Sequence, residues 1–229
     1  MDGSMAMKPA GKGIFGKLPG HGDFVQRDLP SSFVTPWDEW LQRAVHGSRE
    51  LVGEKWLDYY LTSPIWRFAL SSGVLSERAW AGILVPSVDS VGRYFPVTMA
   101  VPLAAGTNPF DIQVRAESWY AALSELAIEA LQNALLVDHL SERFPVLAML
   151  DAGASSPEGA AEQRLLSVEG SIDLAYPGLL EAMCKDQYSS FSLWWCAPSP
   201  SVNHNVMLSA GLPDPSVYCT MLGAPKYHW

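Results

Sequence analysis

Two short stretches of this chain collect the residues whose types and spacing could do chemistry. The first, residues 16–24, reads GKLPGHGDF, and the second, residues 86–96, reads PSVDSVGRYFP. In both, Gly and Pro set the backbone angles while ionisable side chains stay near water, which is typical of shaped loops rather than of core. Two such loops in one chain predict a recognition surface.

Enzyme signatures fit these loops poorly. A phosphate-binding loop needs Gly-Lys followed by Ser or Thr, and here Leu18 follows. Ser87, His21 and either Asp89 or Asp23 are of the types found in a catalytic triad, but the Gly-x-Ser-x-Gly motif is absent and a triad is defined by geometry. We therefore expect no catalytic residues and no cofactor. A hydrolase or phosphatase with a polar cleft between the loops is the alternative.

A network of charges is the better interpretation of the two loops. Asp89 and Arg93 lie four residues apart around Gly92, so the second loop can fold back and join them by a charge-assisted hydrogen bond. Asp23 or Arg27 from the first loop could join the same network. The charges either brace two loops at the edge of a sheet or expose part of the network to a protein partner. The candidates for these two roles are Lys17, Gly20, Asp23, Phe24, Arg27, Trp66, Arg67, Ser87, Asp89 and Arg93.

Trp66 and Arg67 enter this set through their place on a predicted strand. Residues 66–70 alternate between large apolar and other side chains, which indicates a strand with one buried face. Trp66 should be buried there, while Arg67 points to the other side. We expect Arg67 to reach Asp23 or Asp89 from that position.

Composition and charge narrow the class of protein. The 229 residues are 48% hydrophobic and 17% charged, which is enough apolar material for a sizeable core. The net charge of −9 disfavours nucleic acid and anionic membrane surfaces as partners, because no basic patch is visible to offset it. Nine Trp residues fit core anchors and also a protein-binding face.

The remaining compositional signals point to a cytoplasmic location. The three cysteines, Cys184, Cys196 and Cys219, are odd in number and far apart, as expected for reduced thiols rather than a disulfide or metal set. Metal-ligand spacings such as Glu-x-x-His are missing, so we expect no metal site. A signal peptide and an uncharged apolar run long enough to span a membrane are also missing, so we expect no membrane insertion.

Strand and helix patterns alternate along the chain and must position the loops. A helix is predicted to begin with Thr35 as its cap and Pro36 as its first residue, and the longest helix to begin after Asn108. Another helix pattern covers residues 56–60, and further ones lie within 172–183 and after Asp214. Strand patterns cover residues 13–17, 66–70, 80–85, 97–101, 146–150, 191–196 and 206–209.

These patterns predict an α/β fold. We expect a mixed sheet, largely with antiparallel neighbours, and helices on both faces in a three-layer sandwich. Residues 1–12 read as a flexible lead and 13–150 as the main domain carrying both loops. Residues 151–229 read as a C-terminal extension packed on the same sheet, with a smaller separate lobe as the alternative.

Several motifs resemble the TagF family of type VI secretion-associated proteins. They occur in the family's order and cover residues 13–103 most closely, with looser matches at SLWW (192–195) and GLP (211–213). The stretch 153–170 matches no family pattern. The closest motifs are GKLP (16–19), GDF (22–24), WDEWL (37–41), SPIWRFAL (63–70) and the whole second loop.

The resemblance implies a specific role. Members of the family are post-translational repressors of the bacterial type VI secretion system, thought to bind a scaffold protein with a forkhead-associated domain. Threonine kinase and phosphatase partners belong to the same circuit. The resemblance also implies a non-enzymatic, cytoplasmic regulator with an α/β layered fold. A structural subunit of a larger assembly is a second alternative.

Overall fold

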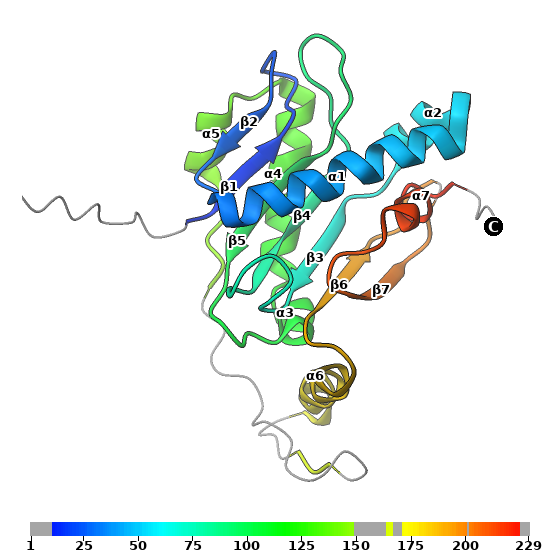
Figure 1. The fold of residues 1–229 in the computed structure, drawn as a ribbon. Helices are drawn as coiled ribbons and strands as arrows, with labels where there is room; N and C mark the ends of the chain where they lie inside the picture. The colour runs from blue at the N-terminus through cyan, green and yellow to red at the C-terminus, as the bar shows by residue number, and fades with distance from the viewer. Residues whose placement is uncertain (1–10, 149–163, 167–170, 201, 225–229) are drawn as a thin grey trace, which may run out of the picture.

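One seven-stranded sheet organises the protein, in the strand order β2-β1-β5-β4-β3-β6-β7 (Figure 1). The computed structural model describes residues 11–148, 164–166, 171–200 and 202–224. The strands are β1 (Gly13–Gly16), β2 (Val25–Arg27), β3 (Trp66–Leu70), β4 (Trp80–Val85), β5 (Val97–Pro102), β6 (Phe191–Cys196) and β7 (Asn205–Ala210).

Helices cover both faces of this sheet, so the predicted three-layer α/β fold is confirmed (Figure 1). One layer holds α1 (Ser31–Val52), α2 (Trp56–Thr62) and α7 (Tyr218–Met221), with the 3-10 turns η1 (Gly53–Lys55) and η3 (Pro215–Val217). The other holds α3 (Pro109–Arg115), α4 (Glu117–Asn133), α5 (Val137–Arg143) and α6 (Tyr176–Gln187), with the 3-10 turn η2 (Ile172–Ala175).

The sheet differs from the prediction in being antiparallel at every pair of neighbouring strands, where a mixed sheet was expected. The helical crossovers α1–α2 and α3–α6 connect strands that are not parallel neighbours. The late strands β6 and β7 extend the same sheet, because β6 pairs with β3 along its length.

A cluster of tryptophans fills the face under α1. Trp37 stacks on Trp194 with ring centroids 5.8 Å apart, and both are fully buried. Each indole N–H in this cluster has a partner: Trp37 donates to Thr98 Oγ1 at 2.8 Å and Trp40 to the Pro213 carbonyl at 2.7 Å. These aromatic contacts therefore tie α1 to the sheet and to the C-terminal segment without leaving buried donors unpaired.

Helix α1 begins at Ser31, one turn before the predicted start at Thr35, so that Pro36 lies inside the helix. Proline there removes one backbone hydrogen bond, which costs least near a helix N-terminus. The earlier turn buries Phe33 fully, with its ring 4.5 Å from that of Trp80. Burial of this ring favours the longer helix over the cap that the local sequence predicted.

Two further elements differ from the sequence-based expectation. The helix capped by Asn108 does begin at Pro109, but it breaks at Ala116 into α3 and α4. The structure describes residues 146–148 of the strand predicted at 146–150. The prediction is wrong there, because these residues are not in a strand and Val146 is exposed. Residues 149–150 and most of the stretch 153–170 lie outside the described residues.

Within the described ranges, no helix is both long and apolar enough to span a bilayer.

Candidate functional site

The fold brings the two loops together at one end of the sheet. The first loop leaves β1 and the second connects β4 to β5, and Gly16 at the end of β1 pairs with Val97 at the start of β5. The loops are also joined directly, because the Ser90 backbone N–H donates to the His21 carbonyl at 2.9 Å. The predicted juxtaposition of the two loops is therefore present in the structure.

A buried ion pair lies between the loops. The Lys17 Nζ donates to Asp89 Oδ2 at 2.8 Å, and both side chains are almost completely buried. The other carboxylate oxygen of Asp89 accepts the backbone N–H groups of Val91 at 3.1 Å and Arg93 at 2.9 Å. A buried charge requires such partners, because an unpaired one is expensive to remove from water.

Arg93 extends this ion pair to the surface. Its Nε donates to Asp89 Oδ2 at 2.6 Å, and its Nη2 donates to the Gly22 carbonyl of the first loop at 2.5 Å. The same Nη2 lies 3.8 Å from Asp23 Oδ1, at the edge of contact. The guanidinium is half exposed, so it joins the loops underneath while presenting a charged face to solvent.

The electrostatics of Asp89 follow from these partners. Burial of the carboxyl acts to raise the pKa of Asp89, but the hydrogen bonds from Lys17, Arg93 and Val91 lower it by more. The pKa of Asp89 therefore lies well below its ordinary value, and the network holds its negative charge throughout the neutral range.

Ser87 anchors the second loop to the core rather than forming a triad. Its hydroxyl donates to the Lys17 carbonyl at 2.6 Å, and its backbone N–H and C=O both bond to the Tyr60 hydroxyl at 2.8 Å. The His21 Nε2 accepts the backbone N–H of Val137 at 2.9 Å. Among the described residues, Ser87 and His21 are thus each engaged by backbone groups instead of by one another.

Gly20 fits because the first loop runs against the end of α4. A Cβ at Gly20 would lie 2.5 Å from the Ala134 carbonyl oxygen, closer than real contacts allow. Ala134 itself has the left-handed φ of 49° that ends α4. Only glycine fits at position 20 without a shift of the backbone, because the absence of a side chain lets the first loop pack against the end of α4.

Three of the ten candidate residues have their side-chain partners away from the two loops. Arg67 was expected to reach Asp23 or Asp89, but its Nη1 pairs with Glu117 Oε2 on α4 at 2.6 Å. Arg67 emerges on the face of the sheet that α4 covers, which is the reason for the different partner.

Arg27 and Trp66 are likewise held elsewhere. Arg27 pairs with Asp138 on α5. The buried Trp66 donates its indole N–H to the Met221 carbonyl at 2.9 Å. Sequence reasoning did not single out Tyr60, although a Tyr on an otherwise apolar helix face indicates a hydroxyl that needs a partner.

The loop tips present a small mixed surface. Phe24 is 46% exposed and packs its ring 5.0 Å from that of Phe95, with the Lys17 ammonium 4.9 Å from its centroid. Val91 is 67% exposed at the tip of the second loop, although sequence reasoning did not select it. Together with the exposed Asp23 and the half-exposed Arg93, these residues form what we call the tip surface.

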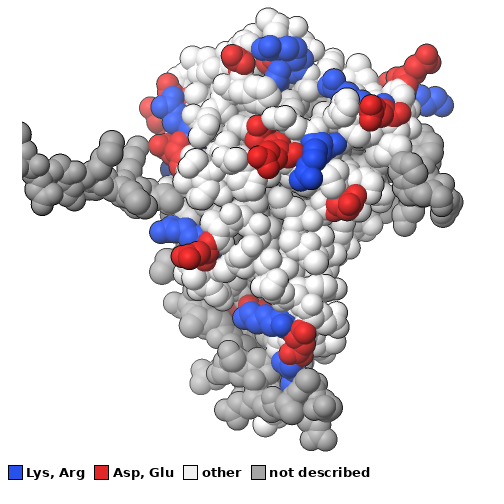
Figure 2. Space-filling view, in the orientation of Figure 1, with Lys and Arg blue, Asp and Glu red and all other residues white. Residues whose placement is uncertain are grey.

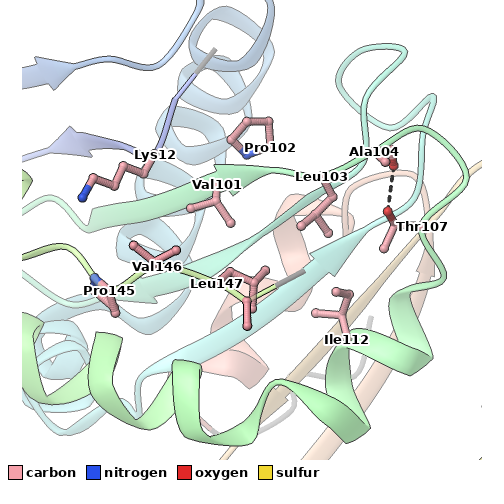
Figure 3. Close-up of a pocket in the computed structure, with 11 residues that line it drawn as sticks. Lys12, Val101, Pro102, Leu103, Ala104, Thr107, Ile112, Pro145, Val146 and Leu147 are labelled. Carbon is pink, nitrogen blue, oxygen red and sulfur yellow. Dashed lines mark hydrogen bonds between the residues drawn. The ribbon is translucent and has the colours of Figure 1, made fainter. Parts of the chain in front are cut away.

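The surface charges outside the two loops and one apolar cavity are separate from this site. On the face in Figure 2, basic and acidic side chains occur mostly as neighbouring pairs of opposite sign, without a broad basic patch. A mostly apolar cavity of about 420 Å³ lies between the end of β5, α3 and residues 145–148, with Lys12 at one end and Thr107 at the other (Figure 3). Within the described residues, no group of three or more His, Cys, Asp or Glu side chains could hold a metal ion.

Comparison with known proteins identifies the family. The TagF N-terminal domain, described as type VI secretion system-associated, matches residues 13–147, which include both loops and the sheet strands that carry them. The chain belongs to the TagF family. It is thus a type VI secretion system-associated protein, as the motif resemblance implied.

A solved structure supports the same assignment. The crystal structure of PA0076 from Pseudomonas aeruginosa PAO1 superposes with a TM-score of 0.80 at 31% sequence identity. The match covers 95% of this TagF-family chain and 96% of PA0076, so the shared fold includes β6 and β7 as well as the N-terminal part. No curated protein matches the chain.

Proposed function

We propose that this TagF-family protein is a non-enzymatic, cytoplasmic repressor of the type VI secretion system. It would act after translation, by binding a scaffold protein that carries a forkhead-associated domain and keeping it out of an active assembly. Membership in a type VI secretion-associated family supports the setting of this proposal. The resemblance described above supplies the repressive role and the class of partner.

The observation that carries the proposal is the tip surface. Phe24, Val91 and Arg93 are an aromatic ring, an exposed aliphatic side chain and a guanidinium, held on two loops that the buried Lys17–Asp89 pair locks together. Exposed aromatic and Arg side chains on a rigid support are typical of binding hot spots, because little freedom is lost when a partner covers them.

The same network is compatible with both roles expected for the candidate residues. Lys17, Ser87 and Asp89 are buried and brace the loops. Asp23, Phe24 and Arg93 are exposed to different degrees and would meet the partner. The proposal therefore assigns binding to the tips and preorganisation to the groups beneath them.

Val91→Glu tests the binding role without removing a packing contact. The purified scaffold would be titrated with the wild-type protein and the variant, and the dissociation constants compared. We expect Val91→Glu to weaken binding at least about tenfold, the size of effect seen for residues inside a binding surface, while the melting temperature stays unchanged.

Leu61→Glu is the matched control, because Leu61 is 59% exposed on α2 and outside the tip surface. It should bind as the wild type does. Equal affinity for the wild type and Val91→Glu would overturn the assignment of the tip surface.

A further inference from the structure

The two edges of the sheet differ in a way that matters for association. At one end, β2 has only three residues, and its Arg27 pairs with Asp138 of α5, which packs against that edge. At the other end, β7 has six residues, reads NVMLSA, and carries no charge and no proline. Exposed edges usually carry charges, prolines or bulges that block further pairing, and β7 has none of these.

The register fixes which backbone groups of β7 point outward. In antiparallel pairs, alternate residues exchange hydrogen bonds, and Gly211 N–H donates to the Ser190 carbonyl just beyond the strand ends. Because every second residue pair after Gly211 and Ser190 is hydrogen-bonded, the backbone groups of Asn205, Met207 and Ser209 bond to β6. The N–H and C=O groups of Val206, Leu208 and Ala210 therefore point away from the sheet.

The same residues expose apolar side chains. Val206 is 68% exposed and Leu208 is 41% exposed, and Ala210 is exposed beside them. Val206 and Leu208 lie opposite Trp195 and Leu193, so they share the sheet face that α3 to α6 partly cover. In the same helical layer but away from β7, η2 and α6 carry exposed apolar side chains at intervals of three and four residues. These are Ile172, Tyr176, Leu180 and Met183.

We propose that β7 pairs with β7 of a second copy of this chain, so that two sheets join into one across a two-fold axis. An antiparallel two-fold centred on Leu208 pairs all three outward-facing residues at once. Leu208 then lies opposite Leu208 of the second copy, and Val206 lies opposite its Ala210. The outward N–H and C=O groups of one copy then face the C=O and N–H groups of the other, because the two residues of such a pair exchange two hydrogen bonds.

The absence of charged residues on β7 favours a second copy at this place, and the small area of the edge limits how tightly it binds. Two chains with a net charge of −9 repel one another, and β7 offers a seam that is free of carboxylates. Edge pairing alone covers less than the roughly 800 Å² per partner of a standard interface, as is usual for weak and reversible association. We therefore expect a reversible dimer with a dissociation constant in the micromolar range. This inference does not depend on the proposed function.

Sedimentation equilibrium of the full chain over a wide concentration range tests the dimer. Leu208→Lys places two like charges directly opposite at the centre of the seam and should abolish the dimer. Leu61→Lys, at another exposed leucine that lies on α2, should leave it intact. A wild-type protein that stays monomeric, or a dimer that persists in folded Leu208→Lys, would overturn the proposal.

Cysteine cross-linking tests the register even if Leu208→Lys fails to fold. Opposed residues have Cα atoms about 5.5 Å apart, within the range of a disulfide, so Leu208→Cys should form a covalent dimer under mild oxidation. Val206→Cys should not, because it would lie about 14 Å from its own counterpart, four residues along the strand. The native cysteines are buried and free. Equal cross-linking of the two variants, or none in Leu208→Cys, would contradict the register and the proposal with it.

Discussion

Removal of the Tyr60 hydroxyl, in the variant Tyr60→Phe, tests how the second loop is held in place. This hydroxyl accepts the Ser87 backbone N–H and donates to the Ser87 carbonyl, each at 2.8 Å, and the Tyr60 side chain is completely buried. Burial raises the pKa of Tyr60 above its ordinary value, so the group stays a neutral donor over the whole range of stability measurements. Phenylalanine keeps the ring and removes only the oxygen.

The magnitude follows from the two backbone groups that lose their partner. Leaving a buried donor or acceptor unsatisfied costs about 1–3 kcal/mol each, so we expect the free energy of unfolding to fall by about 2–6 kcal/mol. For a chain of this size, the lower end of that range already corresponds to a drop in melting temperature of roughly 4–8 °C. Urea unfolding followed by tryptophan fluorescence gives the free energy, and calorimetry gives the melting temperature.

The neighbouring variant Tyr59→Phe is the control, because Tyr59 lies on the same helix and is only partly buried. Its effect should stay within about 0.5 kcal/mol, as is usual for surface substitutions. If Tyr60→Phe unfolds at the same denaturant concentration as Tyr59→Phe, the Tyr60 hydroxyl does not anchor the loop and our description of the site is wrong.

Two further predictions concern the same site. Because the pKa of folded Asp89 lies below that of the unfolded chain, the stability that its ionised form contributes is present above about pH 4 and is lost as the pH falls. The difference in unfolding free energy between the wild type and Asp89→Asn should therefore shrink from about pH 6 to about pH 3 in urea titrations, and a constant difference would contradict this. Gly20→Ala should lower the melting temperature, because its Cβ would meet the Ala134 carbonyl at 2.5 Å. Gly47→Ala in α1 has open space around the new methyl group and should raise the unfolding free energy by up to about 1 kcal/mol; equal effects of the two substitutions would refute the packing argument.

The sequence predicted β3, β4 and β6 better than it predicted the helix ends, but it missed β2 and placed a strand at 146–150 that the described residues there do not form. Strands β3, β4 and β6 were located from apolar runs and alternation, since these patterns reflect burial in the sheet directly. The start of α1 was misplaced because Pro36 and Thr35 imitate a helix start, while the burial of Phe33 against Trp80 depends on tertiary packing. That contact cannot be read from local sequence.

The candidate site was predicted in its centre and not at its periphery. The Asp89–Arg93 bond follows from residue spacing around Gly92, and the structure confirms it. The partners of Arg27 and Arg67 come from α5 and α4, whose positions over the sheet depend on the order of strands. The exposure of Val91 and the anchoring by Tyr60 also depend on how the loops pack, so sequence spacing alone could not assign them.

Hydrogen–deuterium exchange of the protein with and without the forkhead-associated scaffold measures the contact surface most directly. Backbone amides of residues 20–24 and 88–94 should exchange more slowly in the complex, while those at the outward edge of β7 should keep the rates of the free protein. Unchanged exchange in both loops, with slower exchange elsewhere in the complex, would contradict the claim that the tip surface binds the partner.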